Sequence, residues 1–167
     1  WANTATFTAG AGTVTFNKAS ATQTLNSGGS SFNNLTHSAA GTLQLVTSDV
    51  TVGGDVTNSS GTLDANGRNM TVTGNWANTA TFTAGAGTVT FNKGSATQTL
   101  NSGGSGFNNL THSAAGTLQL VTNDVTVAGG LTNSSGTLDA NGRNMTVTGN
   151  WANTATFTAG AGTVTFN

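Results

Sequence analysis

The chain consists of near-identical copies of one unit. Seventeen residues, WANTATFTAGAGTVTFN, occupy positions 1–17 and recur unchanged at 76–92 and 151–167. Residues 1–75 differ from residues 76–150 at only six positions, namely Ala19/Gly94, Ser31/Gly106, Ser48/Asn123, Gly53/Ala128, Asp55/Gly130 and Val56/Leu131. Near-copies of this kind are typical of solenoids, in which each unit buries its apolar face against its neighbours. We therefore expect repeat 1 (1–75), repeat 2 (76–150) and the start of repeat 3 (151–167) to form one continuous solenoid.

Charge and apolar content exclude several classes of partner. Only 5% of the 167 residues are charged, and the net charge is -1. The four cations, Lys18, Arg68, Lys93 and Arg143, are scattered, whereas a phosphate-binding surface needs a cluster, so we expect no nucleic-acid partner. No apolar run approaches the roughly 20 residues of a membrane span. The absence of Cys excludes disulfides and thiolate metal sites.

Short segments alternate apolar residues with Thr, and Gly, Asn and Ser separate these segments. Examples are Leu43–Leu45, Val50–Val52 and Met70–Val72. A period of two residues indicates strands with one buried face. An antiparallel sandwich or barrel is the alternative, but the Asn-Gly pairs typical of hairpins occur only at 66–67 and 141–142.

A Gly-Thr pair followed by an alternating segment divides the repeat further. It begins at Gly12, Gly41 and Gly61 and again at Gly87, with intervals of unequal length between these positions. Each interval contains three short strand-like segments. The sequence therefore predicts an all-β fold: a right-handed, three-sided parallel β-solenoid with three coils per 75-residue repeat, rising about 14 Å per repeat.

Alternation also places polar residues inside this solenoid. Leu35, Val56 and Trp76 align on one side, and the residues two positions later share their inward direction. Buried polar groups need hydrogen-bond partners, and stacked Asn side chains can bond one another along a ladder. We therefore predict a polar ladder in the core, formed by His37, Asn58 and Asn78, with His112 and Asn133 as its second copy.

Several runs, including GTVTFN, FNNLTH, GTLQLVTSDVTVGGDVT and GTLDANGRNMTVTGN, resemble the β-strand repeat regions of large bacterial surface and secreted proteins. These are adhesin-like chains akin to filamentous haemagglutinins and autotransporter passenger domains. The resemblance covers the whole chain, although His37 stands where that pattern has an apolar residue, and Trp1 and Trp76 are larger than the aliphatic residue expected there. It implies a right-handed parallel β-helix, secretion, and a role as a stalk, a fibre or an adhesive surface.

Catalytic and metal-binding residues do not converge in this pattern. Equivalent carboxylates such as Asp64 and Asp139 would lie roughly 14 Å apart, whereas paired glycosidase carboxylates need about 5–9.5 Å. His37 and His112 are also one repeat apart, with no second His or Cys nearby to share a metal ion. We therefore predict no enzyme activity, no cofactor and no metal site. A polysaccharide-degrading β-helix is a remote alternative.

Thr-x-Thr segments and the three Trp residues suggest two surface functions. Binding of ice would need two adjacent columns of Thr. In the predicted alignment Thr13, Thr42 and Thr62 form one column, but the next column contains Thr15, Gln44 and Asp64. The alignment therefore disfavours ice binding. Trp1, Trp76 and Trp151 could form a stripe for sugars, but their parity places them in the core.

A structural function fits these observations best. We expect a repeat segment of an extracellular or cell-surface fibre, stalk or filament, stabilised by axial stacking of coils. Its partner would be itself, through a longer chain or end-to-end stacking, with lateral bundling as a further form of association. The alternative is a multivalent adhesin that binds glycans or another cell surface, with loops such as Asn26–Ser31 as contact points.

Overall fold

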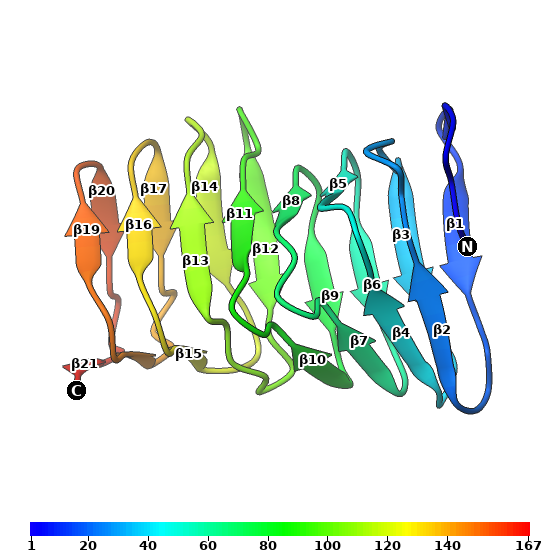
Figure 1. Cartoon of the computed structure of the whole chain (residues 1–167). Helices are drawn as coiled ribbons and strands as arrows, with labels where there is room; N and C mark the ends of the chain where they lie inside the picture. Colours follow the sequence, from blue (N-terminus) through cyan, green and yellow to red (C-terminus); the bar gives the residue numbers. More distant parts are fainter.

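The structure is a computed structural model that describes residues 1–167, and it contains strands and turns but no helix. The strands are short because Gly, Asn and Ser interrupt the alternating segments every few residues. Figure 1 shows them side by side along one long axis, with the two termini at opposite ends. They are β1 (Thr13–Phe16), β2 (Thr22–Leu25), β3 (Asn34–His37), β4 (Thr42–Leu45), β5 (Val50–Val52), β6 (Val56–Asn58), β7 (Thr62–Asp64), β8 (Met70–Val72), β9 (Trp76–Asn78), β10 (Thr81–Thr83), β11 (Thr88–Phe91), β12 (Thr97–Asn101), β13 (Asn109–His112), β14 (Thr117–Leu120), β15 (Val125–Val127), β16 (Leu131–Asn133), β17 (Thr137–Asp139), β18 (Met145–Val147), β19 (Trp151–Asn153), β20 (Thr156–Thr158) and β21 (Val164–Phe166).

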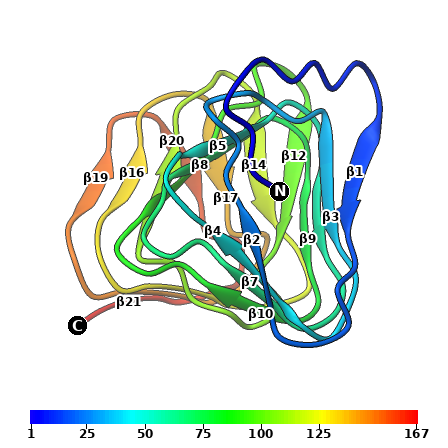
Figure 2. The same cartoon turned by 45° about the vertical axis from the view of Figure 1, so that its right-hand side comes forward.

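Consecutive strands occupy three sides in turn, and every pairing between strands is parallel. The first side has the order β1-β3-β6-β9-β12-β14-β17-β20, and the second has β5-β8-β11-β13-β16-β19. The third side carries β2-β4-β7-β10 and then β15-β18-β21. Residues 105–107 lie between these two groups, because the Phe82 N–H donates to Ser105 Oγ and Phe107 bridges to Val127. The nested three-sided outlines are visible in Figure 2.

This architecture confirms the predicted all-β parallel solenoid. The first side carries eight strands, one for each winding. Residues paired in adjacent windings are 20 positions apart in β4 and β7, 19 in β17 and β20, and 24 between Trp76 and Leu100. Right-handed winding stays a prediction from the general preference of parallel crossovers.

The prediction of three coils per repeat is wrong. On the second side four windings lead from Val50 to Leu131, through the successive partners Met70, Val89 and Leu110. The equivalent of Val50 in repeat 2 is Val125, which comes before Leu131, so one repeat is shorter than four windings. Repeat 2 contains ten strands, β9–β18, and the bridge at Phe107, which are eleven strand positions on three sides. Each repeat thus makes about 3⅔ windings and rises about 18 Å rather than about 14 Å.

The error came from aligning the segment after Gly12 with those after Gly41 and Gly61. In the structure β1 pairs with β3, whereas β4 stacks on β2, the ATQTL segment. The interval after Gly12 and the interval after Gly61, which contains both β9 and β10, are therefore each one ordinary winding plus one extra strand, rather than a winding enlarged by a loop.

Equivalent residues of successive repeats consequently lie on different sides. Trp76 pairs with Val56 on the first side, and Trp151 pairs with Leu131 on the second. Ala2, beside Trp1, bridges to Asn26 at the end of β2 on the third side. Because eleven strand positions are one short of four full windings, each copy is turned by a third of a winding relative to the copy before it.

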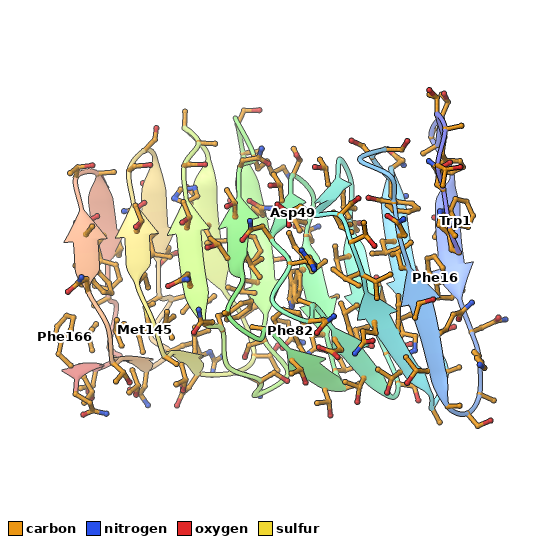
Figure 3. All side chains as sticks on the ribbon, in the orientation of Figure 1. Trp1, Phe16, Asp49, Phe82, Met145 and Phe166 are labelled. Carbon is orange, nitrogen blue, oxygen red and sulfur yellow. The ribbon has the colours of Figure 1, made fainter.

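One apolar core runs the length of the solenoid. Its 30 buried residues include Leu43, Val50 and Met70 from the alternating segments and the predicted inward column of Leu35, Val56 and Trp76. Of the three Trp residues predicted in the core, only Trp76 is buried; Trp151 is partly buried and Trp1 is exposed. Aromatic rings concentrate around Trp76, whose ring centroid lies 4.9 Å from that of Phe82, 6.1 Å from Phe91 and 5.8 Å from Phe107. Phe16, Phe82 and Met145 lie inside the ribbon, with Trp1 and Phe166 towards its two ends (Figure 3).

Candidate functional site

Side chains of the predicted polar ladder lie inside the solenoid and hydrogen-bond from winding to winding. Strands β3, β6 and β9 stack in register and bring His37, Asn58 and Asn78 together on one inward column. His37 Nδ1 lies 2.9 Å from Asn58 Oδ1, and Asn58 Nδ2 donates to Asn78 Oδ1 at 2.7 Å. All three residues are at most 2% exposed.

Hydrogen bonding in this column assigns the His37 tautomer. Asn58 Nδ2 donates both to Asn78 Oδ1 and to the Thr81 carbonyl at 2.8 Å, so both of its hydrogens are used and its Oδ1 is the acceptor. His37 Nδ1 therefore carries the hydrogen. Asn78 Nδ2 in turn donates to the Ser102 carbonyl at 2.7 Å, which extends the column into the next winding.

The second copy repeats this geometry on another side. His112 Nδ1 lies 2.9 Å from Asn133 Oδ1, and Asn133 Nδ2 donates to Asn153 Oδ1 at 2.7 Å. Strands β13, β16 and β19 belong to the second side, so the ladder has moved by a third of a winding. His112 Nε2 is buried without a hydrogen-bond partner. These contacts make the ladder a structural element that joins windings, with no opening to solvent at its central residues.

Sequence reasoning missed Gln98 as a member of the buried polar set. Gln98 is fully buried, and its Nε2 donates to the Val72 carbonyl at 2.8 Å and to the Gly74 carbonyl. These hydrogen bonds connect the start of β12 to the corner that follows β8. The signal was present, because Gln98 precedes the inward Leu100 by two positions and therefore shares its direction.

Three of the five carboxylates, those of Asp49, Asp55 and Asp124, are exposed and accept a backbone N–H of the next winding. Asp49 Oδ1 accepts the Asn69 N–H at 2.8 Å, and Asp55 Oδ1 accepts the Asn75 N–H at 2.7 Å. Asp64 lies in β7 on the third side and its equivalent Asp139 in β17 on the first, so these two carboxylates face different directions. No group of three or more His, Cys, Asp or Glu residues is arranged to hold a metal ion.

The pKa of the Asp124 carboxyl is lowered from its ordinary value of 3.8. The Asn144 backbone N–H, which donates to Asp124 Oδ1 at 2.9 Å, lowers this pKa most. The Asn144 side-chain amide and the nearby Arg143 guanidinium lower it further. This carboxylate is held in its charged form by a structural contact between windings.

Thr columns differ from those predicted. Thr42 and Thr62 stack, but Thr22 rather than Thr13 continues the column. Its neighbouring column begins with Thr24, not Thr15, and still contains Gln44 and Asp64. The second side carries an unbroken column of Thr51, Thr71, Thr90, Thr111 and Thr132. A single Thr column is ordinary for an exposed sheet face.

The three Trp residues do not form a stripe, because they lie on three different sides. Trp76 is 1% exposed and belongs to the core, whereas Trp1 at one end of the structure is 43% exposed. The rotation of the repeats thus prevents the once-per-repeat aromatic residue from lining one face.

A shallow groove recurs in each complete repeat. The first groove has a volume of about 320 Å³ and is lined by Phe7–Gly10, Ser31–Asn33 and Gly53. The second has a volume of about 330 Å³ and is lined by Phe82–Gly85, Gly106–Asn108, Thr126 and Ala128. The lining carries no charged residue. Two of the six differences between the repeats, Ser31/Gly106 and Gly53/Ala128, face this groove.

Comparisons with known proteins identify no relative of this chain. No protein-family model, no curated protein and no solved structure matches the chain. The structure also contains no helix with the length and apolarity that crossing a membrane requires. The geometry described above is therefore the basis for the functional proposals.

Proposed function

We propose that the chain is a structural segment of an extracellular or cell-surface fibre, whose length comes from repetition of nearly identical windings. The observation that carries this proposal is the parallel stacking along one axis. On each side the strands succeed one another along the long axis of the molecule, as one sheet on the first and second sides and as two on the third. Every inner winding covers the edges of its neighbours, so additional repeats extend the fibre at nearly constant stability per repeat.

Hydrogen bonds between windings and the low net charge support a mechanical rather than a catalytic role. The buried polar side chains of His37, Asn58 and Gln98 hydrogen-bond to neighbouring windings. Surface carboxylates likewise hydrogen-bond between windings. A net charge of -1 gives little repulsion between copies, which favours axial and lateral association.

Electron microscopy and fibre diffraction of the purified protein test this proposal. We expect filaments with a strong meridional reflection at about 4.8 Å, since the strands lie across the axis. We also expect a meridional spacing of about 18 Å from 3⅔ windings, with a full axial period of about 53 Å after three repeats. Dispersed monomers at high concentration would contradict self-association. Protease shaving of intact cells that produce the protein tests its surface location.

A multivalent adhesin is the second candidate, and the recurring groove favours it. Its lining offers hydroxyl and amide groups such as Thr83, Thr126 and Asn108 above the buried rings of Phe82 and Phe107. Uncharged polar groups around an apolar floor suit neutral sugars better than ionic ligands. The groove opens on the second side at Phe32 and on the third side at Phe107, so a fibre would present it in several directions.

A glycan array with the purified protein tests this second function. Binding that is reduced when Thr126→Trp fills the second groove, and is unchanged when the exposed Thr81→Ala alters the surface nearby, would support it. Absence of binding to any neutral glycan leaves the fibre function alone.

A further inference from the structure

The hydrogen-bond ladder of the third side is interrupted in the second repeat, directly after β10. The Phe82 N–H points toward the next winding but donates to Ser105 Oγ, at 3.0 Å, instead of to a backbone carbonyl. Phe107 pairs with the winding beyond it, because its N–H donates to the Thr126 carbonyl and its carbonyl accepts the Ala128 N–H, both at 2.9 Å. No backbone hydrogen bond joins β10 to the segment from Ser105 to Phe107.

Two consecutive glycines account for this interruption. Gly103 and Gly104 have φ of 62° and 79°, a conformation that other residues rarely adopt, and the chain forms no strand beside β10 after this turn. The sequence NSGGS recurs in repeat 1, where the Phe7 N–H likewise donates to Ser30 Oγ, at 3.1 Å. The interruption is therefore a property of the repeated sequence.

Backbone groups of the second groove are left without partners by this interruption. In β10 the Thr81 N–H and the Thr83 carbonyl bond to the preceding winding, so the Phe82 carbonyl points toward the next one. The groups that make no hydrogen bond within the protein are the carbonyl of Phe82 and the N–H groups of Ala84, Gly106 and Asn108. All four residues line the groove. Backbone polar groups require partners, so these groups can bond to a ligand.

The chemistry of this lining favours a small neutral ligand that carries an amide. An amide offers one N–H donor and one carbonyl acceptor, which match the unpaired carbonyl and N–H groups of the groove. The buried rings of Phe82 and Phe107 form an apolar floor, and no charged residue lines the groove. Its volume of about 330 Å³ lies at the small end of the range for ligand sites, which suits a single sugar residue.

The two sequence differences between the grooves lie on either side of the apolar floor. Ser31 of the first groove corresponds to Gly106 of the second, and Gly53 corresponds to Ala128. The second groove therefore lacks a hydroxyl group and gains a methyl group. The Ala128 N–H donates to the Phe107 carbonyl, so this methyl group is held beside the floor and favours an apolar substituent on the ligand.

We propose that the second groove binds the acetamide group of a neutral N-acetylated sugar, which completes the interrupted ladder. This inference rests on the adhesin function, the second candidate above, and names its class of glycan. The acetamide carbonyl accepts from the free N–H groups, and its N–H donates to the Phe82 carbonyl. Its methyl group packs against Ala128. The first groove has no Cβ at Gly53 and binds the same sugar more weakly.

Nuclear magnetic resonance of the ¹⁵N-labelled full-length chain, below the concentration at which filaments form, tests this proposal. The probe is a soluble oligomer of N-acetylglucosamine, and the control ligand is a glucose oligomer of the same length. We expect the N-acetylated oligomer to shift the amide signals of Ala84, Gly106 and Asn108, and the glucose oligomer to leave them unchanged.

Variants of the groove assign these shifts to the site. Thr126→Trp should abolish the shifts in the second groove and leave those in the first. Ala128→Gly, which restores the residue type of repeat 1, should weaken binding at the second groove about two- to fourfold through loss of the methyl contact. The exposed Thr81→Ala is the matched control and should leave the affinity unchanged.

The outcomes separate this inference from the function on which it rests. Equal shifts with the glucose oligomer would contradict recognition of the acetamide while leaving the adhesin function in place. Equal shifts with N-acetylalanine amide, which has an acetamide but no sugar ring, would contradict the assignment to a sugar. Binding that leaves the groove amides unshifted would put the site elsewhere and overturn the inference. Absence of binding to any neutral sugar would overturn the adhesin function itself.

Discussion

At the scale of single residues, one amide side chain joins three windings. Asn58 bonds to His37 in the winding before it and to Asn78 and the Thr81 carbonyl in the winding after it. We expect Asn58→Ala to lower the free energy of unfolding by about 2–4 kcal/mol, because it leaves several buried polar groups without partners. Urea denaturation measures this loss.

The outward neighbour on the same strand is the matched control. Thr57 lies on β6 beside Asn58 and is half-buried on the surface. Thr57→Ala should change stability by less than about 1 kcal/mol. Equal decreases in the free energy of unfolding for Thr57→Ala and Asn58→Ala would contradict a stabilising role of the ladder.

The difference between Asp55 and Gly130 provides a second test within one chain. Asp55 Oδ1 accepts the Asn75 N–H, whereas Gly130 has no side chain to accept the Asn150 N–H. A Cβ at Gly130 would meet no atom closer than 3.6 Å, so the site has room. We expect Gly130→Asp to stabilise the protein by about 0.5–1 kcal/mol, and Asp55→Gly to destabilise it similarly. A loss of stability in Gly130→Asp would contradict the capping role, and thermal denaturation measures both variants.

Asp124 should contribute a dependence of stability on pH. Its pKa is lowered in the folded protein, chiefly by the Asn144 N–H, so its contribution is present above the ordinary value of 3.8. That contribution is lost as the pH falls through the lower folded pKa. We expect Asp124→Asn to reduce stability at pH 7 and to flatten the acid side of the pH profile. Urea midpoints between pH 7 and pH 2 measure this, and parallel profiles for both proteins would contradict it.

At the scale of elements, strands begin at corners where glycines of successive windings stack. Gly61 has φ +64, and a Cβ there would collide with the Gly41 and Ala39 carbonyl oxygens. Gly61→Ala should therefore destabilise the protein by more than about 1 kcal/mol. Gly53→Ala is the control, because a Cβ there lies 3.8 Å from the Phe32 oxygen and repeat 2 carries Ala128 at the equivalent position. Calorimetry of the two variants should show clearly different losses of stability.

Strand faces could be predicted from the sequence because alternation is a local property. It placed Leu43, Val50 and Met70 in the core. It also placed Leu35, Val56 and Trp76 in one column, which the structure confirms. The pairing of β2 with β4 could not be predicted in this way, because several Thr-rich strands have the same pattern and only winding length distinguishes their partners.

Whether a candidate site could be predicted also depended on whether a local sequence pattern marks its residues. His37, Asn58 and Asn78 could be named because they follow apolar residues by two positions on three adjacent strands. The recurring groove could not be predicted, since its two walls, around Phe82 and Phe107, are distant in the sequence and meet only when successive windings stack. No local pattern in the sequence marks that meeting point.

At the scale of the whole molecule, a repeat is not a whole number of windings. This determines which residues each side of the solenoid exposes. With 3⅔ windings per repeat, a residue and its equivalent in the next repeat lie on different sides. After three repeats, or eleven windings, the pattern returns to the same side at about 53 Å. A fibre of this chain would therefore have three equivalent sides, each displaced along the axis from the next by about 18 Å.

Distances between paired spin labels test this arrangement most directly in the isolated chain. Thr51 and Thr132 lie in one column on the second side, four windings apart. Labels at these positions should be about 19 Å apart, with a narrow distribution. Thr51 and its equivalent Thr126 should instead give a distance that crosses the solenoid, because Thr126 lies in β15 on the third side. A separation of about 14 Å between positions 51 and 126 would mean three windings per repeat and would contradict the structure described here.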